Sequence, residues 1–367
     1  MRAYINGKIF TGYKILTNHC VLTRDGTIQD VVDGAATPPH AEIIDLRGNL
    51  LAPAFIDLQI YGGNGQLFGE FPSAAALKAT RAYCLSGGAT LFLPTVATNS
   101  EAVMFAAIDA VREYRQQGGK GVGGLHLEGP FINPAKRGAH LSEFIQSPTL
   151  ENVKKILSYG EGVIKMMTFA PELCSDEVLD FLLQQNIVLS AGHSNATYEQ
   201  AMTAFGKGIN TATHLFNAMS ALQHRAPGMA GAIFNHPGVC VSIVADGHHV
   251  DFPVIRMSKN LLEERLFLIT DAVTANLNGR YTHRLQSDKY VVADGTLSGS
   301  ALTMIQAVRN CIEHAGIPLE EALRMASLYP ARVLGLERQY GRIEAGFTAS
   351  FVVLNQQADL VSVFEPS

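Results

Sequence analysis

The segment Ile187-Val188-Leu189-Ser190-Ala191-Gly192-His193 is a short apolar run that ends in a glycine and a histidine. Strands that are buried on both faces of a parallel sheet have continuous apolar runs of this kind. Similar runs recur along the chain, at Leu50–Leu58, Ala89–Pro94, Val122–Leu127, Val163–Thr168, Asn210–Thr213, Val239–Val244 and Leu266–Thr270. The sequence therefore predicts eight buried parallel strands.

Helical segments separate most of these strands. Ser73–Ser86 is followed by Gly87-Gly88, and Ser100–Gln117 is followed by Gly118-Gly119, the stop signal expected just past a last helical turn. Strands and helices in this alternation predict the α/β class and a (β/α)8 barrel of the TIM type. An open doubly wound sheet is the alternative, because the number of strands does not prove that a barrel closes.

The two ends of the chain have a different pattern. The turn pairs Asn6-Gly7, Asp25-Gly26 and Asp33-Gly34 separate short apolar segments, and the tail contains a strand-like run at Ala349–Leu354. We expect residues 1–48 plus 345–367 to form a small β-sandwich domain built from both chain ends, and residues 49–344 to form the barrel. Within the barrel, Tyr281–Leu297 is expected to be a hairpin insertion.

Composition limits the class of protein. Of the 367 residues, 47% are hydrophobic and 17% are charged, which predicts a large buried core. The net charge of -5 and the lack of any Lys or Arg run argue against a nucleic-acid or membrane partner. Scattered cysteines without a C-x-x-C pair, no signal-like N-terminus and no long apolar window predict a cytoplasmic protein. The glycines at 119–124 precede a strand, so they do not form a dinucleotide-binding loop.

Ionisable residues stand at the ends of four predicted strands. These residues are Glu128, His193, His214 and Asp271. Because reactive residues of a (β/α)8 barrel lie at the carboxyl ends of its strands, all four are expected to project into one bowl. One carboxylate and two imidazoles suit a single zinc ion with an open position for water, whose pKa falls to about 7 on the metal. Asp271 is then the natural general base. Core packing or a structural ion pair is the alternative for each residue alone.

The other histidines are less informative. His126 shares a strand face with Glu128, which is compatible with support of the site or with simple packing. His140 lies in the loop after Glu128, and His248 and His249 follow the seventh predicted strand, so these three are expected near the functional rim. For the remaining ones we expect surface positions: His19, His40, His224, His236, His283 and His314.

Several blocks together resemble the N-acetylglucosamine-6-phosphate deacetylase family of the amidohydrolase superfamily. They are His126–Phe131, Gly192–Ser194, Thr213–Met219, Ala245–Gly247 with His249, Thr270–Ala272, Gly295–Ser300 and Leu328–Arg332. The resemblance implies a distorted barrel with a small β-sandwich, and a hydrolase that removes the acetyl group of N-acetyl-D-glucosamine 6-phosphate.

The resemblance also implies roles for single residues. Glu128, His193 and His214 would hold the metal, Asp271 would be the acid and base, and His140 would stabilise the developing oxyanion. The residues implied around the substrate are Ala139, Asn217, Ala218, Arg225, His249, Leu297, Ser298, Gly299 and Ser300. Arg225 would contact the phosphate from the neighbouring subunit of a homodimer.

One position departs from many amidohydrolases. Where these carry His-x-His on the first strand for a second metal, this chain has Gln59-Ile60-Tyr61. An amide and a phenol are poor zinc ligands, so we expect one metal ion per subunit, with Gln59 contacting water or substrate. The alternatives in function are an amidohydrolase acting on N-acetylgalactosamine 6-phosphate or a cyclic amide, and a non-catalytic assembly protein that kept the barrel.

Overall fold

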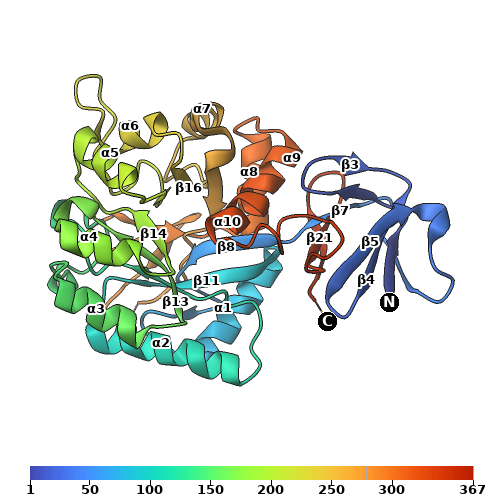
Figure 1. Cartoon of the computed structure of the whole chain (residues 1–367), viewed down its shortest axis with the longest axis horizontal. Helices are drawn as coiled ribbons and strands as arrows, with labels where there is room; N and C mark the ends of the chain where they lie inside the picture. Colours follow the sequence, from blue (N-terminus) through green and yellow to red (C-terminus); the bar gives the residue numbers. More distant parts are fainter. Residues whose placement is uncertain (278, 367) are drawn as a thin grey trace.

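A computed structural model describes residues 1–277 and 279–366. The chain forms a large barrel of alternating strands and helices with a smaller all-β module beside it (Figure 1). Both chain termini lie in the smaller module, which is blue with a red segment in the figure. The predicted fold class is therefore confirmed.

Eight parallel strands form the barrel. They pair in the order β17-β16-β15-β14-β13-β12-β11-β8, so that each strand lies beside its neighbour in the chain. Their bounds are β8 Phe55–Ile60, β11 Ala89–Ala97, β12 Leu125–Glu128, β13 Ile164–Phe169, β14 Val188–Ala191, β15 Thr211–Ala212, β16 Cys240–Val244 and β17 Leu266–Ile269. Most of their residues are buried, as the continuous apolar runs predicted.

The first and last strands meet and close the barrel. The amide of Asp271 donates to the carbonyl of Gln59, and the amide of Tyr61 donates to the carbonyl of Ala272, both at 2.9 Å. Beside these bonds the buried carboxylate of Asp57 accepts from the Thr270 amide at 3.1 Å and from its hydroxyl at 2.5 Å. These contacts exclude the open doubly wound sheet.

Helices cover the outside of the barrel (Figure 1). The predicted ends of the first two helices are confirmed. Ser73 and Ser100 cap the amino ends with side-chain hydrogen bonds, and glycines follow the last turns. The bounds are α1 Ala74–Ser86, α2 Glu101–Gln116, α3 Leu150–Tyr159, α4 Asp176–Leu183, α5 Tyr198–Gly206, α6 Gly228–Asn235, α7 Phe252–Leu262, α8 Met304–Glu313, α9 Leu319–Ala326 and α10 Leu328–Val333.

The smaller module consists of two sheets with one apolar core. One sheet has the order β5-β4-β1-β6 and the other the order β22-β21-β7-β2-β3. Their strands are β1 Arg2–Ile5, β2 Lys8–Phe10, β3 Ile15–Leu16, β4 His19–Arg24, β5 Thr27–Asp33, β6 Glu42–Asp45, β7 Leu50–Pro53, β21 Phe351–Leu354 and β22 Leu360–Phe364. Tyr4 and Val21 of the first sheet pack in the same cluster as Leu51 and Phe351 of the second, so both chain ends contribute to one core.

One predicted strand is wrong in its extent. Leu50–Leu58 was expected to be a single barrel strand, but it is two strands, because β7 pairs with β21 and β2 in the smaller module and only β8 enters the barrel. Both parts are buried and apolar, so composition could not separate them. The domain boundaries at residues 48/49 and 344/345 stay predictions.

Two short β-structures stand near the barrel mouth. The strands β9 Gly62–Gly63 and β10 Gln66–Leu67 form a small hairpin after β8. The expected insertion after β17 is a three-stranded sheet, made of β18 Arg284–Gln286, β19 Lys289–Val291 and β20 Leu297–Ser300. In the described part of the chain, none of the helices has both the length and the apolar character needed to cross a membrane.

We expect Thr270→Val to lower the free energy of unfolding by about 2–3 kcal/mol at pH 8, because a charged buried carboxylate loses its hydroxyl donor. Burial raises the pKa of Asp57 to about 6, and loss of a donor raises it further. The substitution destabilises only the charged form of Asp57. The difference in unfolding free energy between variant and wild type should therefore shrink as the pH falls below this pKa. Urea unfolding followed by circular dichroism at pH 8 and pH 5 measures both effects.

The control is Thr203→Val, which removes an exposed hydroxyl that bonds the Glu199 carbonyl within α5. This variant should lose less than about 1 kcal/mol at either pH. Equal losses in the two variants would contradict the role assigned to the contact between β8 and β17.

Candidate active site

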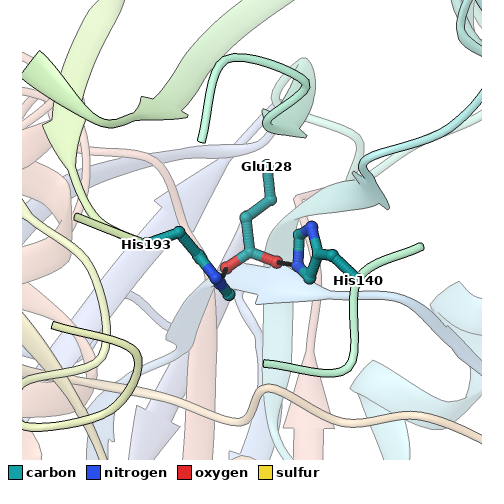
Figure 2. A group of neighbouring side chains, drawn as sticks. All are labelled: Glu128, His140 and His193. Carbon is teal, nitrogen blue, oxygen red and sulfur yellow. Dashed lines mark hydrogen bonds and ion pairs between the residues drawn. The ribbon is translucent and has the colours of Figure 1, made fainter. Parts of the chain in front are cut away.

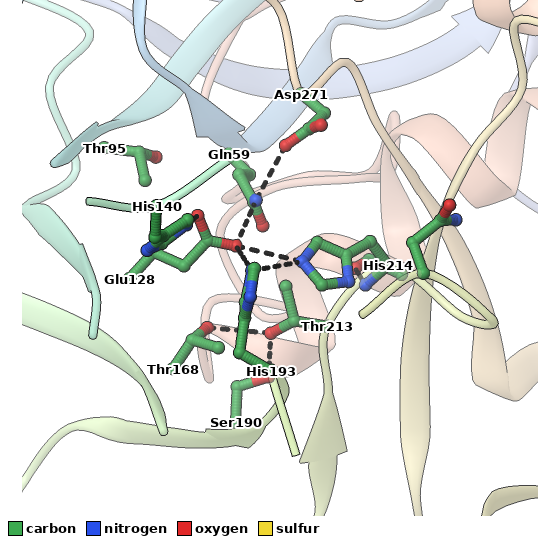
Figure 3. A network of polar contacts seen from close by, with 12 residues as sticks. Gln59, Thr95, Glu128, His140, Thr168, Ser190, His193, Thr213, His214 and Asp271 are labelled. Carbon is green, nitrogen blue, oxygen red and sulfur yellow. Dashed lines mark hydrogen bonds and ion pairs between the residues drawn. The ribbon is translucent and has the colours of Figure 1, made fainter. Parts of the chain in front are cut away.

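The four predicted strand-end residues meet in one place (Figure 3). Glu128 is the last residue of β12, whereas His193, His214 and Asp271 each stand two residues beyond β14, β15 and β17. The latter three have positive φ angles of 47°, 38° and 55°. Left-handed backbone in residues other than glycine costs free energy and is concentrated at functional sites. Here it turns each side chain from the strand end toward the barrel axis.

Glu128 is the centre of the cluster and is almost fully buried. Its Oε1 lies 3.0 Å from Nε2 of His214 and 3.3 Å from Nε2 of His193, and these two nitrogens are 3.1 Å apart. Burial acts to raise the pKa of Glu128, but the neighbouring imidazoles outweigh it and hold this pKa well below its ordinary value. The carboxylate is therefore charged at neutral pH.

The hydrogen bond on the far side of His193 fixes which of its nitrogens carries the proton. Nδ1 of His193 lies 2.8 Å from the carbonyl oxygen of Lys136. Because a carbonyl oxygen only accepts hydrogen bonds, Nδ1 carries the proton, and Nε2 of the neutral ring carries a lone pair. That lone pair faces the carboxylate oxygen of Glu128 and Nε2 of His214. A cation would satisfy the two facing acceptors, Nε2 of His193 and the carboxylate of Glu128. Nε2 of His214, whose Nδ1 has no hydrogen-bond partner among the described residues, completes a set of one carboxylate and two imidazole nitrogens of a kind that zinc binds.

His140 also contacts Glu128, and the two lie with His193 within ligand distance of one another (Figure 2). The backbone amide of Thr98 donates to Nδ1 of His140 at 3.2 Å, so the neutral ring carries its proton on Nε2, which lies 3.0 Å from Oε2 of Glu128. A protonated ring nitrogen does not bind a cation. The geometry thus favours His140 as a hydrogen-bond donor, and His193 and His214 are the residues whose imidazole nitrogens could hold a cation.

Gln59 bridges the two acidic residues, and Tyr61 contacts one of them. Nε2 of Gln59 lies 2.9 Å from Oε1 of Glu128 and 2.7 Å from Oδ1 of Asp271, and the Tyr61 hydroxyl donates to Oε2 of Glu128. Burial and the charge of Glu128 hold the pKa of Tyr61 well above its ordinary value, so the phenol stays neutral. Both residues therefore donate hydrogen bonds to the acidic groups of the site.

Asp271 has the properties of a general base. Burial raises the pKa of this carboxyl to about 7, while His249 opposes the rise and Glu128 adds to it. A group that titrates near neutral pH both accepts and returns a proton readily. Its Oδ1 is occupied by Gln59, and its Oδ2 faces Nε2 of His249 at 3.8 Å.

A cavity of about 240 Å³ opens over this cluster. It is lined by all four strand-end residues and by most of the residues that the resemblance implied, namely Ala139, His140, Asn217, Ala218, His249, Leu297, Ser298 and Gly299. Three predicted contacts do not line it. Gln59 lies behind Glu128 and Asp271, Ser300 is buried with its hydroxyl donating to the Thr270 carbonyl, and Arg225 is exposed on the loop before α6.

Sequence reasoning missed several residues of the cavity wall. His283 was expected at the surface, and this is wrong: it is 5% exposed, lines the cavity, and its Nδ1 lies 3.0 Å from the Ser298 hydroxyl. Tyr281, stacked near this ring, also lines the cavity. Both residues belong to an irregular insertion, which has no periodic pattern of apolar residues from which their burial could be predicted. His126 supports the site from below, bonded to the Leu58 carbonyl and the Thr168 hydroxyl.

The fold is a closed (β/α)8 barrel, and its buried acidic and histidine cluster lies at the carboxyl ends of the strands, where the active sites of barrel enzymes lie. Comparison with known families then gives the assignment: the chain belongs to the amidohydrolase family, whose sequence model matches residues 50–366. Residues 1–51 match a second model, the NagA composite domain.

Relatives with a known name match nearly the whole chain. It is 34% identical to N-acetylglucosamine-6-phosphate deacetylase of Haemophilus influenzae over 98% of this chain and 96% of that protein. It is 33% identical to N-acetylgalactosamine-6-phosphate deacetylase of Escherichia coli O157:H7 over 93% of this chain and 95% of that one. The crystal structure of N-acetylglucosamine-6-phosphate deacetylase from Pasteurella multocida matches with a TM-score of 0.94 and 32% identity, over 100% of this chain and 98% of that chain.

We expect Tyr61→Phe to weaken the binding of a divalent cation by about 10–100-fold, because Oε2 of Glu128 loses the donor that fixes its orientation. Titration of metal-free protein with zinc in competition with a chromophoric chelator measures the affinity. Tyr83→Phe is the matched control, since its hydroxyl bonds the Leu302 carbonyl outside the cavity. An unchanged zinc affinity in Tyr61→Phe would show that this hydrogen bond does not orient the ligand.

Proposed function

We propose that this chain hydrolyses the acetamide of N-acetyl-D-glucosamine 6-phosphate to D-glucosamine 6-phosphate and acetate. The observation that carries the proposal is the convergence of Glu128, His193 and His214 beside Asp271 in one cavity. Full-length relatives with this activity support it. The galactosamine epimer is the substrate named for one relative of similar identity, so it is the comparison substrate in the experiment below.

The donor set fits one zinc ion per subunit, held by Glu128, His193 and His214. The lone pair of His193 and the charged oxygen of Glu128 already point to a common centre. When bound, such a cation would polarise the acetyl carbonyl and lower the pKa of water to about 7. Gln59 and Tyr61 occupy the positions at which a second ion would need ligands.

The chain's own residues supply the proton transfers. Asp271 takes the proton of the attacking water, and then returns it to the nitrogen of the departing amine, so that no other acid is required. His140 lines the cavity and directs its Nε2 proton to Oε2 of Glu128 in this structure. With substrate bound, this proton would shift to the acetyl oxygen as charge develops on it. Asn217 and the backbone around Leu297–Ser300 hold the sugar against these groups.

The phosphate requires a cation from outside the cavity wall. Among the described residues that line the cavity there is neither a lysine nor an arginine. Arg225 is exposed on the loop before α6, and a guanidinium matches a phosphate with two parallel hydrogen bonds. We place this residue in the site of the neighbouring subunit of a homodimer. The five free cysteines suit a reducing compartment, so the cytoplasm is the proposed location.

Asp271→Asn should leave the zinc content unchanged and lower kcat for acetate release by about 10²–10⁴-fold, because the amide cannot accept the proton of water. Acetate is assayed with both epimeric sugar phosphates, and zinc by elemental analysis. Dialysis against a chelator should stop acetate release by the wild-type protein, and added zinc should restore it. Metal-replete wild-type protein that releases no acetate from either epimer would refute the proposed function.

The homodimer is tested by subunit mixing. Arg225→Ala and Asp271→Asn subunits are co-expressed with different tags, and the mixed dimer is purified on both. If Arg225 acts across the interface, the subunit with the Arg225→Ala substitution keeps Asp271 and receives an arginine from its neighbour, so one of the two symmetric sites works. We expect about half of wild-type activity at low substrate concentration. If the mixed dimer is no more active than the two parent homodimers, Arg225 acts in the site of its own subunit or in no site.

A further inference from the structure

Asp246, three residues before His249, has no role in the mechanism described above. It follows β16 in the segment that enters the rim of the cavity. Its Oδ1 accepts the backbone amides of His248 and His249 at 2.9 and 2.8 Å, and its Oδ2 lies 2.6 Å from Nδ1 of His249. The side chains of Asp246 and His249 are 4% and 7% exposed, so water does not compete for these bonds.

The carboxylate fixes the orientation of the imidazole. Because an ionised carboxylate only accepts hydrogen bonds, Nδ1 of His249 carries a proton. Nε2 then points to the other side, where it lines the cavity and lies 3.8 Å from Oδ2 of Asp271. His249 thus stands between two buried carboxylates, and the nearer one is held by two backbone amides.

The charges around His249 favour its protonated form. Burial lowers the pKa of His249, but the bond to Asp246 and the charges of Asp246 and Asp271 outweigh it, and the pKa is raised. His248 on the same loop pairs with Asp288 of the hairpin insertion at 2.9 Å. His214 and Glu128 act on the Asp271 side, where the first lowers and the second raises the pKa of that carboxyl. With Nε2 protonated, the contact with Asp271 becomes attractive.

We propose that Asp246 is a positioning residue that fixes His249 as an imidazolium, with its Nε2 proton directed at Oδ2 of Asp271 and into the cavity. The imidazolium ring places a positive charge at a cavity whose described wall contains neither lysine nor arginine, and the balancing negative charge of Asp246 lies on the far side of that ring. That charge keeps Asp271 ionised, and therefore able to act as a base, at lower pH than burial alone would allow. The kinetic part of this inference rests on the proposed function, whereas the ionisation of His249 does not.

The ionisation is measured by NMR on the full-length protein with ¹³C- and ¹⁵N-labelled histidine, without substrate. The signal of His249 is assigned by its loss in His249→Gln. We expect Asp246→Asn to lower the pKa of His249 by about one unit or more, because an opposite charge at hydrogen-bonding distance is removed. Asp246→Glu keeps the charge and should retain part of the elevation. It also provides the test if Asp246→Asn does not fold.

The kinetic test is the pH profile of kcat/KM for acetate release. Asp246→Asn removes the imidazolium charge that lowers the pKa of Asp271, and also the weaker effect of Asp246 itself, which raises this pKa. The first effect is the larger, so the acidic limb of the profile should move to higher pH by less than about one unit. Asp288→Asn is the matched control, because it breaks the exposed pair with His248 near the same loop and should leave both the His249 signal and the acidic limb unchanged.

The outcomes distinguish the effect of Asp246 on the ionisation of His249 from the effect of His249 on Asp271. If His249 titrates at the same pH in Asp246→Asn and wild type, the positioning role is overturned, whatever the activity. A lowered pKa with an unmoved acidic limb overturns the effect on Asp271. A lowered pKa in a protein that releases no acetate from either sugar phosphate supports the ionic pair and refutes only the proposed function.

Discussion

The closure of the barrel between β8 and β17 is the constraint on which the site depends. Residues 57–61 and 270–272 are far apart in the chain, yet two backbone hydrogen bonds and the buried Asp57–Thr270 contact hold them edge to edge. This contact brings Gln59 within hydrogen-bond distance of Asp271. Without it, the base at the end of the last strand would have no fixed distance to Glu128, and the four strand ends would not enclose a single cavity.

Inside the cavity, the arrangement of protons decides the role of each histidine. His193 and His140 both lie close to Glu128, but a carbonyl bonds the far nitrogen of the first and a backbone amide bonds the far nitrogen of the second. One ring therefore presents a lone pair and the other presents a proton. His249 is held at Nδ1 by a carboxylate, and in our proposal it is protonated at both nitrogens. The roles that we propose for the same residue type, as ligand, donor and cation, thus follow from the group that bonds the far nitrogen of each ring.

Much of the fold and part of the site were predictable from the sequence. The eight apolar runs and the residues at their ends placed Glu128, His193, His214 and Asp271 at one mouth, because parallel strands all end on the same side of a barrel. His283 was not predictable, since it comes from an irregular insertion whose position over the mouth depends on packing. The split of Leu50–Leu58 into β7 and β8 was also hidden, because both strands are buried and the run is apolar across the break between them.

The sequence by itself determined the class of fold, the strand ends that carry chemistry and the replacement of a His-x-His pair by Gln59 and Tyr61. These follow from periodicity and residue type, which are local properties. Only the tertiary structure decided that the barrel closes, which ring nitrogen of each histidine carries a proton, and that Asp246 stands behind His249. Those properties depend on distances of about 3 Å between groups brought together by folding, and hydrogen-bond energies vary steeply over such distances.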